Sequence, residues 1–494
     1  MDCDDGEIGN EEHYMKRKSM SLNVLLNGIK TVFSLLFPLI TFPYITRVLS
    51  PEGVGQANYA SSIANYFILI GGLGIASYAI REGAKRSYQK EEFQKFADEM
   101  WTVSLMSAVF AYMCLFVTLI FSVKLHNYRW LIAIYSFQIL SNAIGMEWVL
   151  NIYEEYAYVT IRSIIFQILS LVLLLCFVRN PEDVYRYVII QMISTVGIGL
   201  ANHIYVRKKL TLKIVFSKKI LEHLRPILLL FSTTLATAIY VNLDTTMLGW
   251  IWGDEQVGYY TAAAKLYNIV KSLINSVVTV YAVRLSSLYY QDKTEYDKSF
   301  KEVFQLITGL TIPMAVGGSL LRNEIIVILG GKEYLAATGS LAVLLASLIF
   351  ATSGNLFGAG VLLIVKKEKY MFAATLTGTF VNMVLNYIFI TKMKCTGAAI
   401  ATLITEIIVC TILAVKASPY LSFKGLIHYG VKEVIASTLF VPVIAGINRL
   451  SIAFWPGLLF KLVLCVMVYA MVLLLLKDEM AIIFWDRLQQ RIKR

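Results

Sequence analysis

The sequence predicts an all-α integral membrane protein with about fourteen transmembrane helices. Of its 494 residues, 57% are hydrophobic and 16% are charged, a composition far too apolar for an ordinary soluble protein. The apolar residues gather in runs of about 20, the length that an α-helix needs to cross a bilayer. Several of these runs also contain charged residues. Burial of a charge in hydrocarbon is costly, so such residues normally face a water-filled cavity or a partner.

Hydrophobic runs of sufficient length place fourteen spans along the chain. The first six cover residues 22–45, 59–80, 101–123, 130–152, 156–178 and 184–206. The other eight cover residues 227–251, 257–281, 303–321, 341–365, 370–390, 395–415, 433–447 and 454–476. Pro313 and Pro442 interrupt the ninth and thirteenth runs, so a count of twelve spans stays open.

The spans divide the chain into two lobes of six helices each, and a short motif is repeated between them. We expect a cytoplasmic tail (1–20), an N-terminal lobe (21–206), a cytoplasmic amphipathic linker (207–225), a C-terminal lobe (226–417), two additional helices (428–476) and a basic cytoplasmic tail (477–494). The motif E-x-V-G-x-x-x-x-A begins at Glu52 and again at Glu255, 203 residues later. Six spans separate the copies, which predicts parallel repeats about an axis normal to the membrane.

The distribution of basic residues predicts the orientation in the membrane. With both ends in the cytoplasm, inside segments hold 30 of the 45 Lys and Arg residues and outside segments hold 10. This positive-inside bias favours an even number of spans with both termini cytoplasmic. The net charge of +12 is therefore attributed to cytoplasmic loops and not to nucleic-acid binding. The six cysteines and five histidines show no metal-site spacing, so we expect no metal.

Polar side chains recur at helical spacing inside several spans, which indicates polar faces on those helices. The central pair of spans has two such stripes: Thr233, Thr237, Tyr240 and Asp244 in one, and Lys265, Asn268, Ser272 and Asn275, with Lys271 at the border, in the other. Hydroxyl and amide stripes are explained equally well by hydrogen bonds between packed helices or by an aqueous cavity. The buried charges favour the cavity, and a cavity across the membrane points to transport.

The candidate binding residues are mostly basic and predict an anionic substrate such as a phosphate or pyrophosphate. Within spans they are Lys30, Arg162, Lys265 and Lys271, for which a cavity competes with internal salt bridges. Near span ends they are Arg47, Arg81 and Arg284, for which snorkelling to the interface is an equal explanation. Asp244 and Glu406 are candidate proton or sodium sites, or else counter-ions, with a pair between Asp244 and Lys265 as one alternative.

Several stretches resemble the polysaccharide-transporter family, the Wzx-type flippases of lipid-linked oligosaccharides within the multidrug/oligosaccharidyl-lipid/polysaccharide exporter superfamily. The similar stretches are residues 42–53 (FPYITRVLSPEG), Gly72-Leu73 through 78–82 (YAIRE), Asn242-Leu243-Asp244 with 247–249 (MLG), residues 257–260 (VGYY) with Ala263 and Lys265, and residues 397–399 (GAA) through Glu406. Together they extend over most of the chain.

The resemblance implies two six-helix bundles around a central cavity, with two C-terminal helices appended. It also implies non-enzymatic alternating access that moves undecaprenyl-diphosphate-linked oligosaccharide units across the bacterial cytoplasmic membrane for O-antigen, capsule or exopolysaccharide synthesis. Arg and Lys would bind the diphosphate, an H⁺ or Na⁺ gradient would drive transport, and no cofactor is expected. We expect a monomer in the lipid bilayer, with a polysaccharide polymerase and glycosyltransferases as partners.

Two alternatives remain at this point. One is a cation-coupled multidrug exporter of the same fold, which would favour an acidic cavity for cationic drugs. The other is a membrane enzyme of polysaccharide assembly, which would normally require large extramembrane loops and clustered catalytic acids. The basic candidate residues disfavour the first alternative, and the short predicted outside loops disfavour the second.

Overall fold

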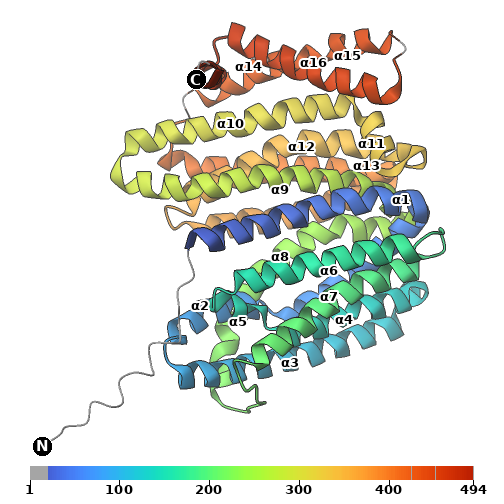
Figure 1. Cartoon of the computed structure of the whole chain (residues 1–494), viewed down its shortest axis with the longest axis vertical. Helices are drawn as coiled ribbons and strands as arrows, with labels where there is room; N and C mark the ends of the chain where they lie inside the picture. The colour runs from blue at the N-terminus through green and yellow to red at the C-terminus, as the bar shows by residue number, and fades with distance from the viewer. Residues whose placement is uncertain (1–19, 424, 451, 493–494) are drawn as a thin grey trace, which may run out of the picture. The chain divides into compact units, whose positions relative to one another are not determined.

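The computed structural model describes residues 20–423, 425–450 and 452–492, and these residues form helices and turns without any β-strand (Figure 1). The all-α prediction is therefore confirmed for the described chain. The predicted cytoplasmic tail (1–20) lies almost wholly outside these residues. The chain divides into two compact units, Met1–Asn242 (unit 1) and Leu243–Arg494 (unit 2). The division falls within helix α8 (Lys219–Trp252) and not in the predicted linker.

Unit 1 is built from long apolar helices and a few short ones. In chain order they are α1 (Met20–Gly72), α2 (Ile75–Arg86), α3 (Lys90–Phe121), the 3-10 helix η1 (Val123–Tyr128), α4 (Arg129–Gly145), α5 (Glu147–Ile152), α6 (Tyr156–Phe177), α7 (Val184–Arg207) and the first part of α8.

Unit 2 follows the same plan and then adds a further group of helices. After the end of α8 come α9 (Asp254–Gln291), α10 (Lys293–Leu320), α11 (Arg322–Gly330), η2 (Lys332–Ala337), α12 (Thr338–Phe357), the π-helical turn η3 (Gly358–Leu362), α13 (Glu368–Ala417) and η4 (Ser418–Tyr420). The remaining helices are α14 (Leu426–Thr438), α15 (Phe440–Asn448), α16 (Phe454–Leu475) and α17 (Glu479–Ile492).

Eleven helical stretches among the described residues are long and apolar enough to cross a membrane. Two of them contain α1 and α13, which have 53 and 50 residues, bend at Ser50 and Lys394, and are each long enough for two crossings. The predicted span 130–152 is covered by α4 and α5, which are separated by Met146. Pro313 lies within the continuous helix α10, whereas α14 ends before Pro442 and α15 begins near it. The count of fourteen stays a prediction.

Equivalent backbone breaks occur at equivalent places in the two units. Ser50 (φ 61°, ψ 166°) and Gly253 (φ 83°, ψ −172°) lie 203 residues apart, and each precedes the repeated E-x-V-G motif. Two six-residue 3-10 helices, η1 and η2, come before α4 and α12 respectively. Glu154 and Lys366 both adopt positive φ shortly before the next long helix. These correspondences support the predicted internal repeat beyond the short sequence motif.

The helices pack around aromatic clusters and expose apolar faces elsewhere, as membrane helices do. In unit 1, Phe93, Phe96 and Trp148 are buried together. In unit 2, Phe300 and Phe357 stack with ring centroids 6.0 Å apart. Large apolar side chains lie exposed along α3, α6, α13 and α16, for example Phe116, Ile165, Phe380 and Val466. Exposed apolar surface of this extent is expected on helices that face lipid.

The segment between α7 and α8 is extended and lies along α3. Backbone amides of alternate residues donate to side chains one turn apart on that helix: Thr211 to Gln94 Oε1 (3.2 Å), Lys213 to Asp98 Oδ1 (3.0 Å) and Val215 to Thr102 Oγ1 (3.0 Å). The side chains of Leu210 and Leu212, which alternate with these residues in the segment, are buried. Alternate residues of this segment and residues one turn apart on α3 are therefore spaced so that they meet.

Candidate functional site

Asp244 forms the centre of a buried polar cluster in unit 2. Its side chain on α8 is 7% exposed and accepts hydrogen bonds from Asn386 Nδ2 (2.6 Å), Thr402 Oγ1 (2.8 Å) and the Tyr260 hydroxyl. Asn386 also donates to Asn382 Oδ1 at 2.9 Å, while its own Oδ1 has no hydrogen-bond partner among the described atoms. The predicted pair with Lys265 is absent, since all the groups that bind Asp244 are neutral.

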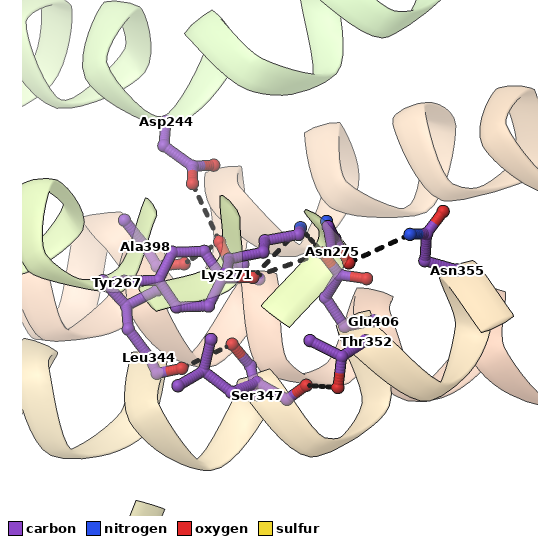
Figure 2. Close-up of polar contacts among 12 residues, drawn as sticks. Asp244, Tyr267, Lys271, Asn275, Leu344, Ser347, Thr352, Asn355, Ala398 and Glu406 are labelled. Carbon is purple, nitrogen blue, oxygen red and sulfur yellow. Dashed lines mark hydrogen bonds and ion pairs between the residues drawn. The ribbon is translucent and has the colours of Figure 1, made fainter. Parts of the chain in front are cut away.

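A second cluster in unit 2 joins Lys271 of α9 to Glu406 of α13. The Lys271 ammonium donates to Glu406 Oε1 at 2.8 Å and to the Tyr267 hydroxyl at 3.2 Å, as Figure 2 shows. Nearby, Asn355 Nδ2 donates to Asn275 Oδ1 at 3.0 Å. The carboxylate of Glu406 is thus neutralised by a cation, unlike that of Asp244.

The other two basic candidates of α9 have different surroundings. Lys265 is half-buried, and no described residue forms a hydrogen bond or ion pair with its ammonium group. Arg284 is exposed, and it too has no polar partner among the described residues. Because a partly buried charge without a counter-ion is costly, Lys265 is the stronger of these two candidates for binding an anion.

In unit 1, Glu147 bridges the two cations that the sequence places within spans. Lys30 Nζ lies 3.4 Å from Glu147 Oε1, and Arg162 Nη2 lies 3.5 Å from Oε2. The Arg162 side chain is 5% exposed, and its Nε and Nη1 groups have no hydrogen-bond partner in the described part of the chain. Two cations share one carboxylate here, so the group carries an excess positive charge.

The remaining basic candidates lie on exposed helix surfaces. Arg47 of α1 donates to the Pro43 carbonyl at 3.0 Å. Arg81 of α2 lies 3.5 Å from the Glu82 carboxylate and 6.0 Å from the centre of the Tyr78 ring. These contacts are local and agree with snorkelling as well as with binding.

Sequence reasoning missed two aromatic members of these clusters, Tyr260 and Tyr267, which lie on the same face of α9 as the predicted Lys271. Tyr260, Tyr267 and Lys271 lie at i, i+7 and i+11 on α9, the same spacing that identified the other polar stripes. Applying that template to tyrosine hydroxyls would have found them. Sequence reasoning also missed a buried chain in unit 1, in which His223 contacts the Tyr78 hydroxyl (2.7 Å) and Glu99 (3.1 Å). No group of three or more His, Cys, Asp or Glu residues that could hold a metal occurs among the described residues.

Long apolar helices that enclose buried polar clusters and ion pairs identify a multi-pass membrane protein. The polysaccharide biosynthesis protein family matches residues 21–283, more than half of the chain, and the protein belongs to this family. The resemblance predicted from the sequence is thereby confirmed.

Curated relatives match most of the chain at low identity. A candidate O-antigen transporter of Escherichia coli K12 is 25% identical over 409 residues, which cover 80% of this chain and 96% of that protein. The capsular polysaccharide biosynthesis protein CapF of Staphylococcus aureus is 21% identical and covers 77% of this chain and 94% of its own length.

Solved structures show the same fold. The lipid II flippase MurJ, in an inward closed conformation, matches with a TM-score of 0.76 and 18% identity over 92% of this chain and 99% of that one. An inward-facing multidrug transporter of the MATE family matches with a TM-score of 0.61 and 14% identity, covering 81% and 98%. At these identities the likeness establishes the fold alone, and it confirms the predicted all-α membrane-protein fold.

Proposed function

We propose that the protein is a flippase that moves undecaprenyl-diphosphate-linked oligosaccharide units across the bacterial cytoplasmic membrane. Family membership supports this proposal, as do relatives named for O-antigen transport and capsular polysaccharide biosynthesis. The protein would act by alternating access and without a covalent step. Its products would feed a polysaccharide polymerase that assembles surface polysaccharide, and glycosyltransferases would supply its substrate.

The observation that carries the proposal is the presence of membrane-embedded cations with unused hydrogen-bond donors. Arg162 is buried and has two unpartnered nitrogen atoms, and Lys265 is half-buried without a described partner. Burying such an unpartnered cation costs several kcal/mol unless an anion accepts its hydrogen bonds and balances its charge. A diphosphate, with many oxygen acceptors, is a suitable anion for arginine and lysine.

Neutralising these cations tests the proposal. In vesicles, Arg162→Ala and Lys265→Ala should each lower turnover of the lipid-linked saccharide by at least about tenfold, the loss expected for one charged hydrogen bond. Arg162→Lys and Lys265→Arg should retain more activity because they keep the charge. Lys95→Ala, which removes an exposed lysine from α3, is the matched control. Full transport by an Arg162→Ala/Lys265→Ala double variant that is present normally in the membrane would contradict the proposal.

The other basic candidates are assigned supporting roles. Lys271 is already paired with Glu406, and Lys30 shares Glu147 with Arg162, so each would contribute less free charge to a diphosphate. Arg47, Arg81 and Arg284 are exposed and would attract the anion before it binds. A cation-coupled multidrug exporter remains the alternative function, and it predicts that Lys265→Ala improves the export of cationic drugs.

We further propose that Asp244 binds the coupling ion, either H⁺ or Na⁺. Its carboxylate has only neutral partners, and the unpartnered Oδ1 of Asn386 lies in the same cluster as Asn382 Oδ1 and Thr402 Oγ1. Side-chain oxygens of this kind suit a hard cation, and a proton would equally neutralise Asp244. Glu406 acts instead as the counter-ion of Lys271, because its charge is already balanced.

A further inference from the structure

Unit 1 contains a polar pocket of its own. Its volume is about 300 Å³, and it lies among the end of α1 and helices α2, α3, α4, α5 and α7. Its polar lining consists of Ser104, Ser141, Asn142, Glu147, Thr195 and Asn202. All of these residues belong to one compact unit. Polar pockets of this size inside membrane proteins call for a polar occupant.

Close helix packing and a backbone break create the pocket wall. A Cβ atom added to Gly199 of α7 would lie 2.1 Å from Ser141 Oγ of α4, so only glycine permits this approach. Met146 has φ 43° and separates α4 from α5, so that Glu147 starts a new short helix at the pocket. The local geometry thus brings Glu147 and the α7 side chain of Asn202 to the same cavity.

Asn202 has hydrogen-bonding groups that the protein does not use. Its side chain is 2% exposed, and its Oδ1 has no partner among the described atoms. The nearby hydroxyl groups donate to backbone carbonyls, Ser104 to Met100 at 2.9 Å and Ser141 to Thr195 at 3.0 Å. Their oxygen lone pairs remain available as acceptors. A buried amide without protein partners requires water or a ligand.

The chemistry of the lining selects a neutral ligand with many hydroxyl groups. Acceptors predominate, since Glu147, Asn202 Oδ1 and the hydroxyl lone pairs all accept hydrogen bonds, and this disfavours an anion. A free cation is also disfavoured, because Lys30 and Arg162 already balance Glu147. The volume lies at the lower end of the roughly 300–1,000 Å³ typical of ligand pockets and admits one small group, not a whole oligosaccharide.

We propose that this pocket binds the sugar that is attached directly to the diphosphate, with Asn202, Asn142 and Glu147 as its hydrogen-bonding residues. Glu147 is the link, since it lines the pocket and also contacts Arg162, a cation assigned to the diphosphate. The inference rests on the proposed flippase function. It adds that these residues determine which first sugar the protein accepts.

Binding of defined lipids to the full-length protein in nanodiscs tests the inference. The probes are undecaprenyl diphosphate alone, the same lipid carrying N-acetylglucosamine, and the same lipid carrying galactose. The native protein should bind at least one sugar-bearing lipid about tenfold more tightly than the bare lipid, as expected for one or two added hydrogen bonds. Asn202→Leu should abolish this difference and leave the affinity for the bare lipid unchanged.

Controls separate a binding role from a folding role. Asn142→Ala changes an exposed residue of the pocket wall and should also reduce the difference, without the risk of a packing defect. Asn58→Leu, outside the pocket, should leave the difference intact, because its amide donates to the Val54 carbonyl (2.8 Å). Equal affinity of the native protein for all three lipids, or an unchanged preference in both pocket variants, would overturn the inference. Failure to bind even the bare lipid would instead contradict the proposed function.

Discussion

Two buried carboxylates of unit 2 differ in the groups that neutralise them. Glu406 forms an ion pair with Lys271, whereas in the described part of the chain Asp244 receives hydrogen bonds from neutral groups, those of Tyr260, Asn386 and Thr402 among them. Because neutral donors stabilise a carboxylate without cancelling its charge, Asp244 retains the ability to attract a cation or a proton. A buried carboxylate therefore has a structural role at Glu406 and a candidate coupling role at Asp244.

Asp183 lies outside the membrane spans and makes the stability of the folded protein depend on pH. Its Oδ2 accepts hydrogen bonds from the backbone amides of Arg179 and Asn180, both at 2.9 Å, and these bonds hold the pKa of Asp183 below its ordinary value. A lowered pKa means that the unfolded chain binds the proton more tightly. The stabilisation is therefore present at neutral pH and is lost as the pH falls through the pKa of the folded state.

Asp183→Asn should consequently lower the thermal unfolding midpoint at pH 7, and this difference in midpoint should shrink as the pH falls toward 3. The measurement compares both proteins in the same detergent between these pH values. The expected difference narrows below about pH 4, where the ordinary aspartate side chain becomes protonated. A difference that persists unchanged to pH 3 would show that the carboxylate charge is not responsible.

The sequence predicted which residues belong to the candidate site better than it predicted which of them contact each other. Helical spacing identified Asp244 and Lys271 as members of polar faces, because that information lies within one helix. It could not show that Asp244 meets Asn386, 142 residues away, since this depends on how α8 and α13 pack. For the same reason, the pairing of Lys30 and Arg162 with Glu147 required the structure.

At the level of elements, the two helix breaks allow a direct test of the internal repeat. Ser50 and Gly253 occupy equivalent positions with similar dihedral angles, in a region of positive φ that favours glycine. A serine there costs about 1–3 kcal/mol of backbone strain, offset in part by the entropy that glycine loses on folding. No atom lies within 4 Å of a Cβ built on Gly253, so strain alone should decide the outcome.

Exchanging the two residue types should therefore give opposite effects on stability. Gly253→Ser should destabilise the protein by about 1–2 kcal/mol, and Ser50→Gly should stabilise it or leave it unchanged. The gain at Ser50 is reduced because its hydroxyl lies 3.5 Å from the Gly53 amide. Gly430→Ala, at an open position within α14, is the control. Thermal unfolding midpoints that move in the same direction for both exchanged variants would contradict equivalent backbone strain.

The length of the apolar runs predicted the long helices, but it did not predict where those helices are interrupted. Pro313 lies within α10 without ending it, since neighbouring helices can accommodate a proline inside a membrane protein. Conversely, α4 ends at Gly145 and α5 begins at Glu147 inside a run predicted as one span. Met146 there adopts a left-handed backbone conformation, which is uncommon for methionine and could not be predicted from its residue type.

For the whole molecule, the charge bias predicts that the two ends of α8 lie on opposite sides of the membrane. Lys208 precedes this 34-residue helix and Asp254 follows it, and about 20 residues suffice for one crossing. In a protein whose native cysteines have been replaced, Lys208→Cys should react with an impermeant thiol reagent only after the cytoplasmic side is exposed. Asp254→Cys should react in intact cells. Labelling of both from the same side would contradict the predicted topology.

An ion gradient should drive transport, and Asp244 should be the residue that binds the coupling ion. Occupation of this carboxylate by a proton or Na⁺ removes an uncompensated buried charge, and a change of that kind can shift an equilibrium between two conformations by a few kcal/mol. Asp244→Asn nearly preserves the shape of the side chain and removes its charge, so it separates coupling from packing.

Reconstituted vesicles provide the measurement, with an imposed proton or Na⁺ gradient and a lipid-linked saccharide as substrate. The gradient should stimulate turnover by the native protein several-fold and should not stimulate Asp244→Asn. Glu406→Gln should lower turnover, because it leaves Lys271 without its counter-ion, yet it should keep the response to the gradient. Asp183→Asn, which removes a carboxylate outside the spans, should respond like the native protein. If the Asp244→Asn variant retains full stimulation, Asp244 is a structural member of its polar cluster and the coupling ion binds elsewhere.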